Sequence, residues 1–216
     1  MKILVTGFDP FGGEKINPAF EAVKLIPDCI EGAEIIKLEV PTVFKKGPQA
    51  TIDAIEIEKY HPDYVFCIGQ AGGRSQITPE FVGINYAQAR IPDNDGDQPF
   101  NQPLVEGGPT AYFTQLPVYA MVEKMKENGI PASVSYTAGT YVCNAMLYCV
   151  LHALNTKYPH IKGGFMHVPY ATSQTVNQPA GTPGMNLNDI ARGIELSIEA
   201  IIENPTDIMA QGGTTH

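Results

Sequence analysis

The stretch KILVTGFDPFGGEKINPAFEAVKLIPDCIEGAEIIKLEV, residues 2–40, decides the fold, because it has the pattern of a strand, a helix and a second strand. The runs at 2–7 and 34–40 are apolar and β-branched, as buried strands are. Between them, Asn17 and Pro18 make a typical helix start, with asparagine as the N-cap and proline at the first helical position. This strand–helix–strand unit predicts an α/β fold.

The same alternation continues along the rest of the chain. We expect strands over 63–69, 132–137 and 163–168, and helices near 45–60, near 110–128, from about 140 to 157, and over 187–204. Several of the strands are almost wholly apolar, which is typical of a sheet covered by helices on both faces. The predicted architecture is a three-layer α/β/α sandwich with a mostly parallel (mixed) twisted central sheet, formed by a single domain over residues 1–216.

Residues 70–109 interrupt this alternation, since they are rich in Gly, Pro, Asn and Asp. A loop of this length in a compact domain is usually functional or disordered. We expect the segment to be an active-site or subunit-interface loop, and the sequence leaves open which of the two it is.

Charge and hydropathy exclude several classes of partner. The chain of 216 residues has 14 Lys and Arg against 23 Asp and Glu, and its net charge of −9 repels a phosphate backbone. No apolar run approaches the roughly 18 to 20 residues of a membrane helix. The N-terminus reaches Asp9 and Pro10 before a signal-peptide core can form. We therefore expect a cytoplasmic protein that binds neither nucleic acid nor membrane.

Motifs for metals and cofactors are missing from the sequence. The four cysteines form no Cys-x-x-Cys pair, and no histidine stands at zinc-finger spacing beside them. The acidic run at 93–97 lacks the glycine and the glutamate of a calcium loop. The glycines after the first strand do not match the dinucleotide fingerprint, because Asp9 stands where a glycine is needed. We predict no metal and no cofactor.

Cys143 lies in SYTAGTYVCNAML, residues 135–147, where a glycine-containing turn precedes an apolar helix. In the first turn of a helix, the unpaired N–H groups and the positive end of the helix dipole favour a thiolate. The dipole contributes at most ~2 kcal/mol, so a base is still required. By position alone, Cys143 is either a nucleophile or a small buried hydrophobe. Cys67 in a strand and Cys149 in mid-helix are expected to be buried core thiols.

His167 is the histidine best placed to act as a base. It comes near the end of the predicted strand in GGFMHVPY, and sites in doubly wound sheets gather at the carboxyl ends of strands. A core histidine satisfied by backbone groups is the alternative. His152 is nine helical residues from Cys143, about 180° around the helix, so it cannot be the base. The remaining histidines lie in connections or at the terminus: His61, His160 and His216.

A carboxylate should bind the second imidazole nitrogen of such a base. Glu80, within QITPEFVGIN at 76–85, is the candidate that a helix surface explains least. A simple loop charge is the alternative reading, and the residue types alone hardly separate Glu80 from Asp93 or Asp95.

Seven blocks of the sequence together resemble the pyroglutamyl peptidase type I family of cysteine peptidases, also called pyrrolidone-carboxylate peptidases. They follow the family's order from residue 6 to about residue 170, and the last 45 residues carry little of the signature. The blocks are TGFDPFGG, NPA, GQAGGRSQITPE, INYAQARIPDNDGDQP, EGGP, VSYTAGTYVCN and GGFMHVPY. The resemblance implies a homotetramer that removes N-terminal pyroglutamate from peptides through a pyroglutamyl thioester.

The resemblance also implies roles for individual residues. Cys143, His167 and Glu80 match the family's catalytic triad, and Arg90 in ARIPDN belongs beside the site. The positions associated with binding the substrate ring are Phe8, Phe11, Asn17, Gln70 and Tyr141. Pyroglutamate has no free amine, so its recognition needs apolar walls and a few hydrogen bonds rather than an acidic residue.

Simpler interpretations of these residues remain open at this point. Phe8 and Phe11 have the pattern of core aromatics, and Arg90 can form a salt bridge with the aspartates that follow it. Two other functions also remain. One is a cysteine amidase or peptidase of different specificity, and the other is a non-catalytic protein that binds a small cyclic ligand.

Overall fold

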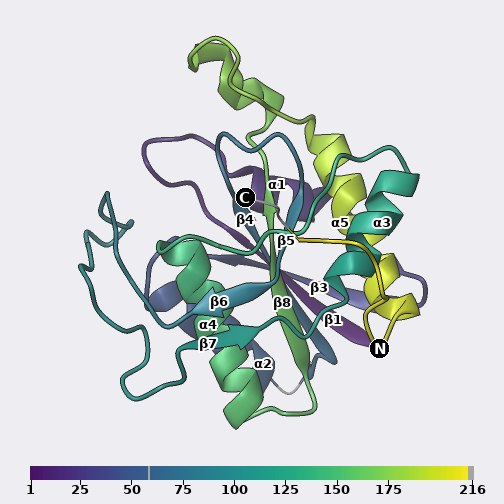
Figure 1. Ribbon diagram of the computed structural model, residues 1–216, viewed down its shortest axis with the longest axis horizontal. Helices are drawn as coiled ribbons and strands as arrows, with labels where there is room; N and C mark the ends of the chain where they lie inside the picture. The colour runs from purple at the N-terminus through teal and green to yellow at the C-terminus, as the bar shows by residue number, and fades with distance from the viewer. Residues whose placement is uncertain (58, 214–216) are drawn as a thin grey trace.

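The central sheet has six strands in the order β2-β3-β1-β4-β8-β5 (Figure 1). The computed structural model describes residues 1–57 and 59–213, so His216 lies outside the described residues. The four inner strands run parallel, and a short antiparallel strand lies at each edge. The inner strands are β3 (Ala33–Val40), β1 (Lys2–Phe8), β4 (Tyr64–Gln70) and β8 (Lys162–Val168), and the edge strands are β2 (Cys29–Ile30) and β5 (Thr78–Glu80).

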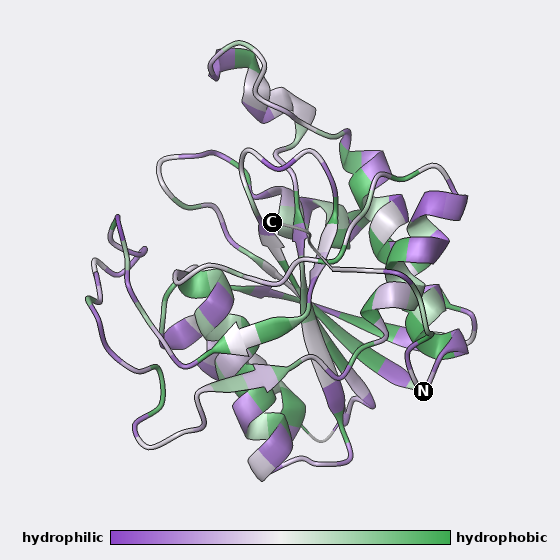
Figure 2. Cartoon of the chain, in the orientation of Figure 1, coloured by the Kyte–Doolittle hydropathy of each residue, from purple (hydrophilic) through white to green (hydrophobic). Residues whose placement is uncertain are grey.

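Helices cover both faces of this sheet (Figure 1). On one face lie α1 (Pro18–Leu25), α3 (Val118–Glu127) and α5 (Leu187–Glu203), and on the other lie α2 (Lys46–Glu56) and α4 (Val142–Thr156). Alternate residues of β1 serve the two faces, since Ile3 and Val5 pack with α1 and α5 whereas Leu4 packs with α4. Figure 2 accordingly shows hydrophobic strands between helices whose outer sides are hydrophilic.

The predicted fold class is confirmed: one α/β domain with three layers and a mixed, mostly parallel sheet. The predicted start of α1 is also correct, since the Asn17 side chain accepts a hydrogen bond from the Ala19 N–H over 3.1 Å. No helix in the described ranges is long and apolar enough to cross a membrane.

The predicted strand over 132–137 is wrong as a regular strand. This segment lies along β5 but pairs with that edge only at two isolated bridges, Ile77 with Ala132 and Glu80 with Ser135. Pro79 lies between the two bridges and has no N–H to donate, so a continuous ladder cannot form there.

The predicted helix near 110–128 begins later than expected. Its first residues form a strand, β7 (Ala111–Phe113), which pairs with β6 (Val82–Ile84) in a separate two-stranded sheet. Pro117 is the N-cap of α3, and a proline disfavours helical geometry in the residue before it, so the helix cannot extend further upstream. The helix expected near 45–60 is likewise shorter, ending at Glu56.

Two irregular segments extend from the body. One is part of the long 70–109 region, which is hydrogen-bonded to α4 at Ile84 and Tyr86. Asn144 of α4 accepts from the Ile84 N–H and donates to the carbonyls of Ile84 and Tyr86. The other includes a 3₁₀ helix, η1 (Thr172–Asn177), which projects at the top of Figure 1. No sequence pattern predicts η1.

Candidate active site

Cys143 and His167 approach each other at Gly69, near the carboxyl end of the sheet. Gly69 pairs with His167 across β4 and β8, and paired residues of parallel strands face the same side. A Cβ atom on Gly69 would lie 3.0 Å from Cys143 Sγ and 2.5 Å from the ring of Phe165. Glycine is therefore the residue that leaves room for the thiol, which projects from the first turn of α4.

Glu80 binds the imidazole of His167 inside the protein. The distance from Nδ1 of His167 to Oε1 of Glu80 is 2.6 Å, and both residues are buried. A carboxylate at Nδ1 fixes the tautomer with the proton on that nitrogen, so Nε2 is the nitrogen that can accept a proton. Phe165 packs edge-on against the imidazole, with ring centroids 4.9 Å apart. The predicted partnership of Glu80 with His167 is thus present in the geometry.

The other two candidate carboxylates have different partners. Asp93 is buried and accepts the N–H groups of Phe44, Asp95 and Asp97, so it organises its own loop. Asp95 forms an ion pair with Lys46 at 2.5 Å. Neither is the carboxylate on His167.

Burial keeps both candidate reactive groups neutral at rest. Burial lowers the pKa of His167, against the raising effect of its hydrogen bond and charge interaction with Glu80. Burial also raises the pKa of the Cys143 thiol to about 12, and the Glu80 charge adds to this rise. The helix dipole is too weak to offset such a rise, so the expected bias toward a thiolate does not hold at rest.

The thiol and the imidazole both border Gly69. Within the described ranges, no hydrogen bond joins Cys143 Sγ to His167. Catalytic hydrogen bonds are often long in unliganded enzymes and shorten when substrate binds. Glu80 itself stays ionised: burial alone would raise its pKa, but hydrogen bonding and charge from His167, with Ser135 and Arg74, hold the pKa below its ordinary value.

Arg74 is a member of this cluster that the sequence analysis missed. Its Nη1 donates to Glu80 Oε1 over 2.7 Å, on the same oxygen that binds His167. A buried carboxylate requires a cationic or hydrogen-bonding partner, and Arg74 is the arginine of the block that ends at Glu80. That requirement was the signal that could have identified it.

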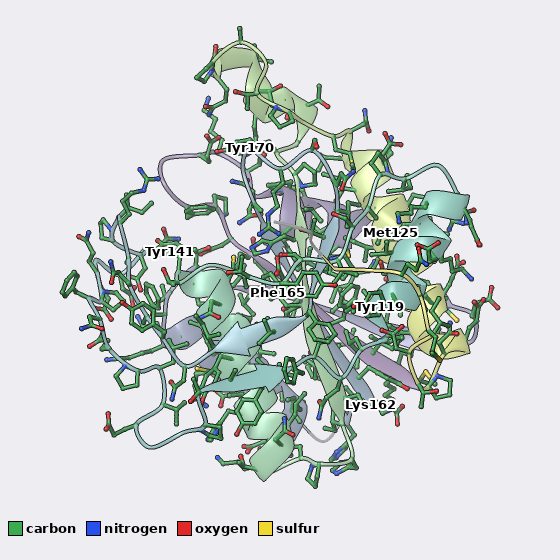
Figure 3. All side chains as sticks on the ribbon, in the orientation of Figure 1. Tyr119, Met125, Tyr141, Lys162, Phe165 and Tyr170 are labelled. Carbon is green, nitrogen blue, oxygen red and sulfur yellow. The ribbon has the colours of Figure 1, made fainter. Side chains whose placement is uncertain are left out.

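An aromatic group lies beside Cys143 at the start of α4. Tyr141 is the N-cap of that helix, and its ring lies 6.3 Å from that of Phe11 and 5.3 Å from that of Phe44, between centroids. Its hydroxyl donates to the Pro92 carbonyl over 3.0 Å. Figure 3 labels Tyr141 near the start of α4 and Phe165 on β8. Phe44 was not predicted, because it lies in a connection without a recognisable motif.

Two of the residues expected at the substrate ring are occupied within the protein. Phe8 is buried and packs against Phe165, with centroids 6.4 Å apart, so it matches the core interpretation. Asn17 is buried as well, and its amide donates to the Asp9 carbonyl over 2.9 Å while capping α1. Their side chains therefore support the site from behind rather than offering free contact groups.

Gln70 is the last residue of β4, and the oxygen of its side-chain amide is hydrogen-bonded within the protein. Its Oε1 accepts a hydrogen bond of 3.0 Å from Nε2 of Gln174 in η1. Gln174 is itself buried and also accepts the Ala171 N–H over 2.9 Å, which fixes its orientation. The Gln70 NH₂ group is left as the donor that can bind a ligand. Gln174 lies outside the recognisable blocks, so no motif indicates it.

Arg90 lies in the irregular 70–109 region. It is exposed, and in the described part of the chain it forms no ion pair or hydrogen bond, either with the three candidate catalytic residues or with nearby aspartates. The alternative salt bridge is therefore absent from the described residues, and the expected role of Arg90 beside the site stays a prediction.

The other thiols occupy different environments. Cys67 is buried as predicted, and burial raises its pKa to about 12. Cys149 is only half-buried, contrary to the prediction, because it lines a cavity of about 430 Å³ between α2 and α4 together with His152. The Nδ1 of His152 lies 3.1 Å from the Tyr112 hydroxyl. His152 thus belongs to this cavity rather than to Cys143, as the helical geometry predicted.

A metal site is not evident in residues 1–57 and 59–213. No group of three or more His, Cys, Asp or Glu side chains there is arranged to hold an ion. That the protein uses no metal and no cofactor stays a prediction.

Comparison with known proteins agrees with this arrangement. The family described as pyroglutamyl peptidase matches residues 1–204. A pyrrolidone-carboxylate peptidase of Clostridium perfringens is 58% identical over 215 residues, covering 99% of both chains, and one of Enterococcus faecalis is 56% identical over 216 residues and the full length of both. The crystal structure of pyroglutamyl peptidase I from Bacillus amyloliquefaciens has a TM-score of 0.93 at 46% identity, over 97% of this chain and 99% of that one. The chain belongs to the pyroglutamyl peptidase family.

Proposed function

We propose that the protein removes N-terminal pyroglutamate from peptides as a cysteine peptidase, with Cys143 as nucleophile, His167 as general base and Glu80 as the orienting carboxylate. The observation that carries this proposal is the 2.6 Å contact of Glu80 with Nδ1 of His167, because it leaves Nε2 to accept the thiol proton. Gly69 supports the assignment by bringing Cys143 Sγ to the same side of the sheet.

The first half of the reaction is proton transfer coupled to attack. His167 takes the Cys143 proton on Nε2 while Sγ forms a bond to the pyroglutamyl carbonyl carbon. Because both groups are neutral at rest, this step creates an imidazolium, which the Glu80 carboxylate stabilises. The carbonyl oxygen becomes an oxyanion, and the unpaired backbone N–H of Cys143 in the first turn of α4 is placed to bind it.

The second half returns the enzyme to its starting state. His167 gives its proton to the departing amine as the carbon–nitrogen bond breaks, which leaves a pyroglutamyl thioester on Cys143. His167 then takes a proton from water as that water attacks the thioester carbonyl. When the carbon–sulfur bond breaks, pyroglutamate leaves and the thiol regains its proton from the imidazolium.

Recognition of the flat lactam follows from the aromatic group and Gln70. Tyr141 and Phe11 supply apolar walls beside Cys143, with Phe8 packed behind the site against Phe165. The Gln70 NH₂ group donates to the lactam carbonyl, since the Gln70 oxygen is held by Gln174. Pyroglutamate has no free amine, so this mode of binding needs no acidic side chain to pair with an ammonium group.

Asn17 and Arg90 have supporting parts in this proposal. Asn17 acts on the ring indirectly, because its amide joins Asp9 to the start of α1. Arg90 is exposed and turns toward the oxyanion only when substrate is bound. An Arg90→Gln variant with an unchanged kcat would contradict this part of the proposal.

The proposal is tested by release of the chromophore from a pyroglutamyl anilide and from an alanyl anilide. Turnover of the first alone, lost in Cys143→Ser, is the expected result. Turnover of the alanyl compound without the pyroglutamyl compound would instead indicate an amidase or peptidase of different specificity. Binding of a pyrrolidone analogue without turnover of either anilide would indicate a non-catalytic binding protein.

Residues 1–216 further form, in our proposal, a single catalytic domain that assembles into a homotetramer in the cytoplasm. Exposed apolar side chains support assembly, since Phe100 in the 70–109 region and Val176 in η1 are each 77% exposed. The four unpaired cysteines fit a reducing compartment.

Light scattering of the purified protein tests the subunit number, and cell fractionation tests the location. Loss of the tetramer in Phe100→Ser would place the 70–109 region at a subunit contact rather than over the substrate.

A further inference from the structure

A sharp turn after β4 places Arg74 beside Glu80. Gly73 has a φ of +91°, a conformation that glycine adopts without strain, and a Cβ atom on Gly72 would lie 2.2 Å from the ring of Tyr170. The Arg74 N–H closes the turn on the Ala71 carbonyl over 3.2 Å. The two glycines thus let the chain reverse, so that Arg74 reaches back along β5.

The guanidinium of Arg74 connects its own turn with two other segments of the chain, β5 and the turn before α4. Its Nη1 donates to Thr78 Oγ1 over 2.6 Å and to Glu80 Oε1 over 2.7 Å, both in β5. Its Nη2 donates to the carbonyl of Thr137 over 3.1 Å. Thr137 lies in the turn that leads into α4, five residues before its first residue, Val142. The two nitrogens of the guanidinium therefore link β5, which contains Glu80, to the turn that precedes α4, the helix that contains Cys143.

The same contact balances the charge of the buried carboxylate. Glu80 is fully buried, with an exposed fraction of 0%, whereas the Arg74 side chain is 30% exposed and keeps part of its hydration. Oε1 of Glu80 accepts from both Arg74 and His167, and Oε2 is buried and has no hydrogen-bond partner among residues 1–57 and 59–213. Without Arg74, the carboxylate would depend on His167 and on nearby Ser135 alone.

We propose that Arg74 is a positioning residue of the catalytic site: it holds Glu80 against Nδ1 of His167 and fixes the turn that sets the position of Cys143. This inference rests on the proposed function, because the geometry that Arg74 maintains matters only if these three residues act together. Arg74 does not touch the aromatic group around Tyr141, so its effect should fall on kcat rather than on KM.

The charged groups facing the imidazole give the proposal a pH signature. Glu80 comes from β5, Cys143 from α4, and Arg74 from the turn after β4, while β4 itself presents Gly69. The positive charge of Arg74 lowers the pKa of His167, and the negative charge of Glu80 raises it. If Arg74 holds Glu80 on Nδ1, its removal also frees Glu80, whose raising effect on the pKa of His167 is larger than the lowering effect of the Arg74 charge. His167 should therefore protonate at lower pH when Arg74 is removed.

The test compares Arg74→Gln and Arg74→Lys in the full-length protein, with kcat and KM for the pyroglutamyl anilide measured across pH. We expect Arg74→Gln to lower kcat by about 100-fold, the cost typical of a misplaced catalytic group, with KM unchanged and the acid limb of kcat/KM moved to lower pH as Glu80 leaves the imidazole. Arg74→Lys keeps a charge that can pair with Glu80 but cannot bind Thr137 at the same time, so it should lose activity with a smaller shift of the acid limb. Arg192→Gln, which removes an arginine bound to Glu195 and Glu199 on α5, is the matched control and should behave as wild type.

Two results would overturn the inference while leaving the proposed function intact. One is wild-type kcat in Arg74→Gln or in Arg74→Lys. The other is a loss of kcat in a folded Arg74→Gln protein whose acid limb has not moved. If Arg74→Gln fails to fold, as judged by circular dichroism, the Arg74→Lys result decides. The proposed function itself fails only if the wild-type protein does not turn over the pyroglutamyl anilide or if Cys143→Ser is active.

Discussion

Cys143 Sγ lies against the backbone of Gly69, at the place where any other residue would carry a Cβ atom 3.0 Å from the sulfur. Gly69 also pairs with His167 in the sheet, so the strand that borders the proposed nucleophile also borders the proposed base. The close approach depends on the missing side chain of a single residue in the middle of the sheet.

Gly69→Ala should therefore impair catalysis more than folding. The added methyl group would meet the Phe165 ring at 2.5 Å and the thiol at 3.0 Å, and both must shift. We expect a loss in kcat of about 100-fold, as for a displaced catalytic group. Steady-state kinetics and thermal unfolding of the same preparation check the result. Wild-type kcat in this variant would show that the thiol does not need this position.

The acid limb of kcat/KM should have its midpoint below pH 6.5, the ordinary imidazole value. His167 must be neutral to accept a proton, and burial lowers its pKa, against the raising effect of Glu80. The base therefore stays competent below its ordinary range, and activity is lost as the pH falls through the pKa of the folded protein. The pH profile with the pyroglutamyl anilide measures the midpoint, with circular dichroism as the control for unfolding. A midpoint above pH 6.5 would contradict this prediction.

Alkylation by iodoacetamide should distinguish Cys143 from the other thiols. Cys29 is exposed, so the comparison requires a Cys29→Ser background. In that background Cys143 should react faster than Cys67 and Cys149, because burial raises the pKa of both to about 12 and neither lies beside an imidazole oriented by a carboxylate, as His167 is by Glu80.

The reaction of Cys143 should also depend on His167, because the resting thiol is neutral and must pass its proton to the imidazole. Peptide mass spectrometry gives the rate at each site, and a pyrrolidone analogue should protect Cys143 alone. An equal rate in His167→Ala would show that the imidazole does not activate the thiol.

Gln174→Glu should weaken substrate binding through Gln70. A carboxylate has no proton to donate to Gln70 Oε1, so the Gln70 amide must turn and present its oxygen to the lactam carbonyl. We expect KM to rise by about tenfold, the effect of one lost hydrogen bond, with a smaller change in kcat. Ser173→Glu adds the same charge to an exposed position of η1 and serves as the control. Equal KM values in the two variants would remove Gln174 from the binding of the ring.

The layers of the fold could be predicted because each long element carries its own pattern. The strands β1 and β8 are mostly apolar and buried after their first residue, and α1 begins at a recognisable Asn-Pro pair. The short strands β5 and β7 carry no such pattern, since three residues are too few to show a period. Their conformation depends on distant partners, which the sequence does not place.

The same distinction applies to the candidate site. Their positions at a helix start and a strand end make Cys143 and His167 candidates, whereas Glu80 is hardly separated from Asp93 or Asp95 without the family resemblance. Arg74 and Gln174 act on other side chains across turns, and such contacts have no period or spacing to detect. Asn17 differs, because the predicted helix cap is correct and itself conflicts with the expected contact to the substrate ring. The cap and the bond to Asp9 together occupy the Asn17 amide.

Asn144 has a consequence for engineering this enzyme. The residue that follows the nucleophile directly in the chain also bonds to the backbone at Ile84 and Tyr86. The region around residues 84–86 therefore cannot be exchanged as an independent module, because a graft that moves it would pull on the neighbour of Cys143.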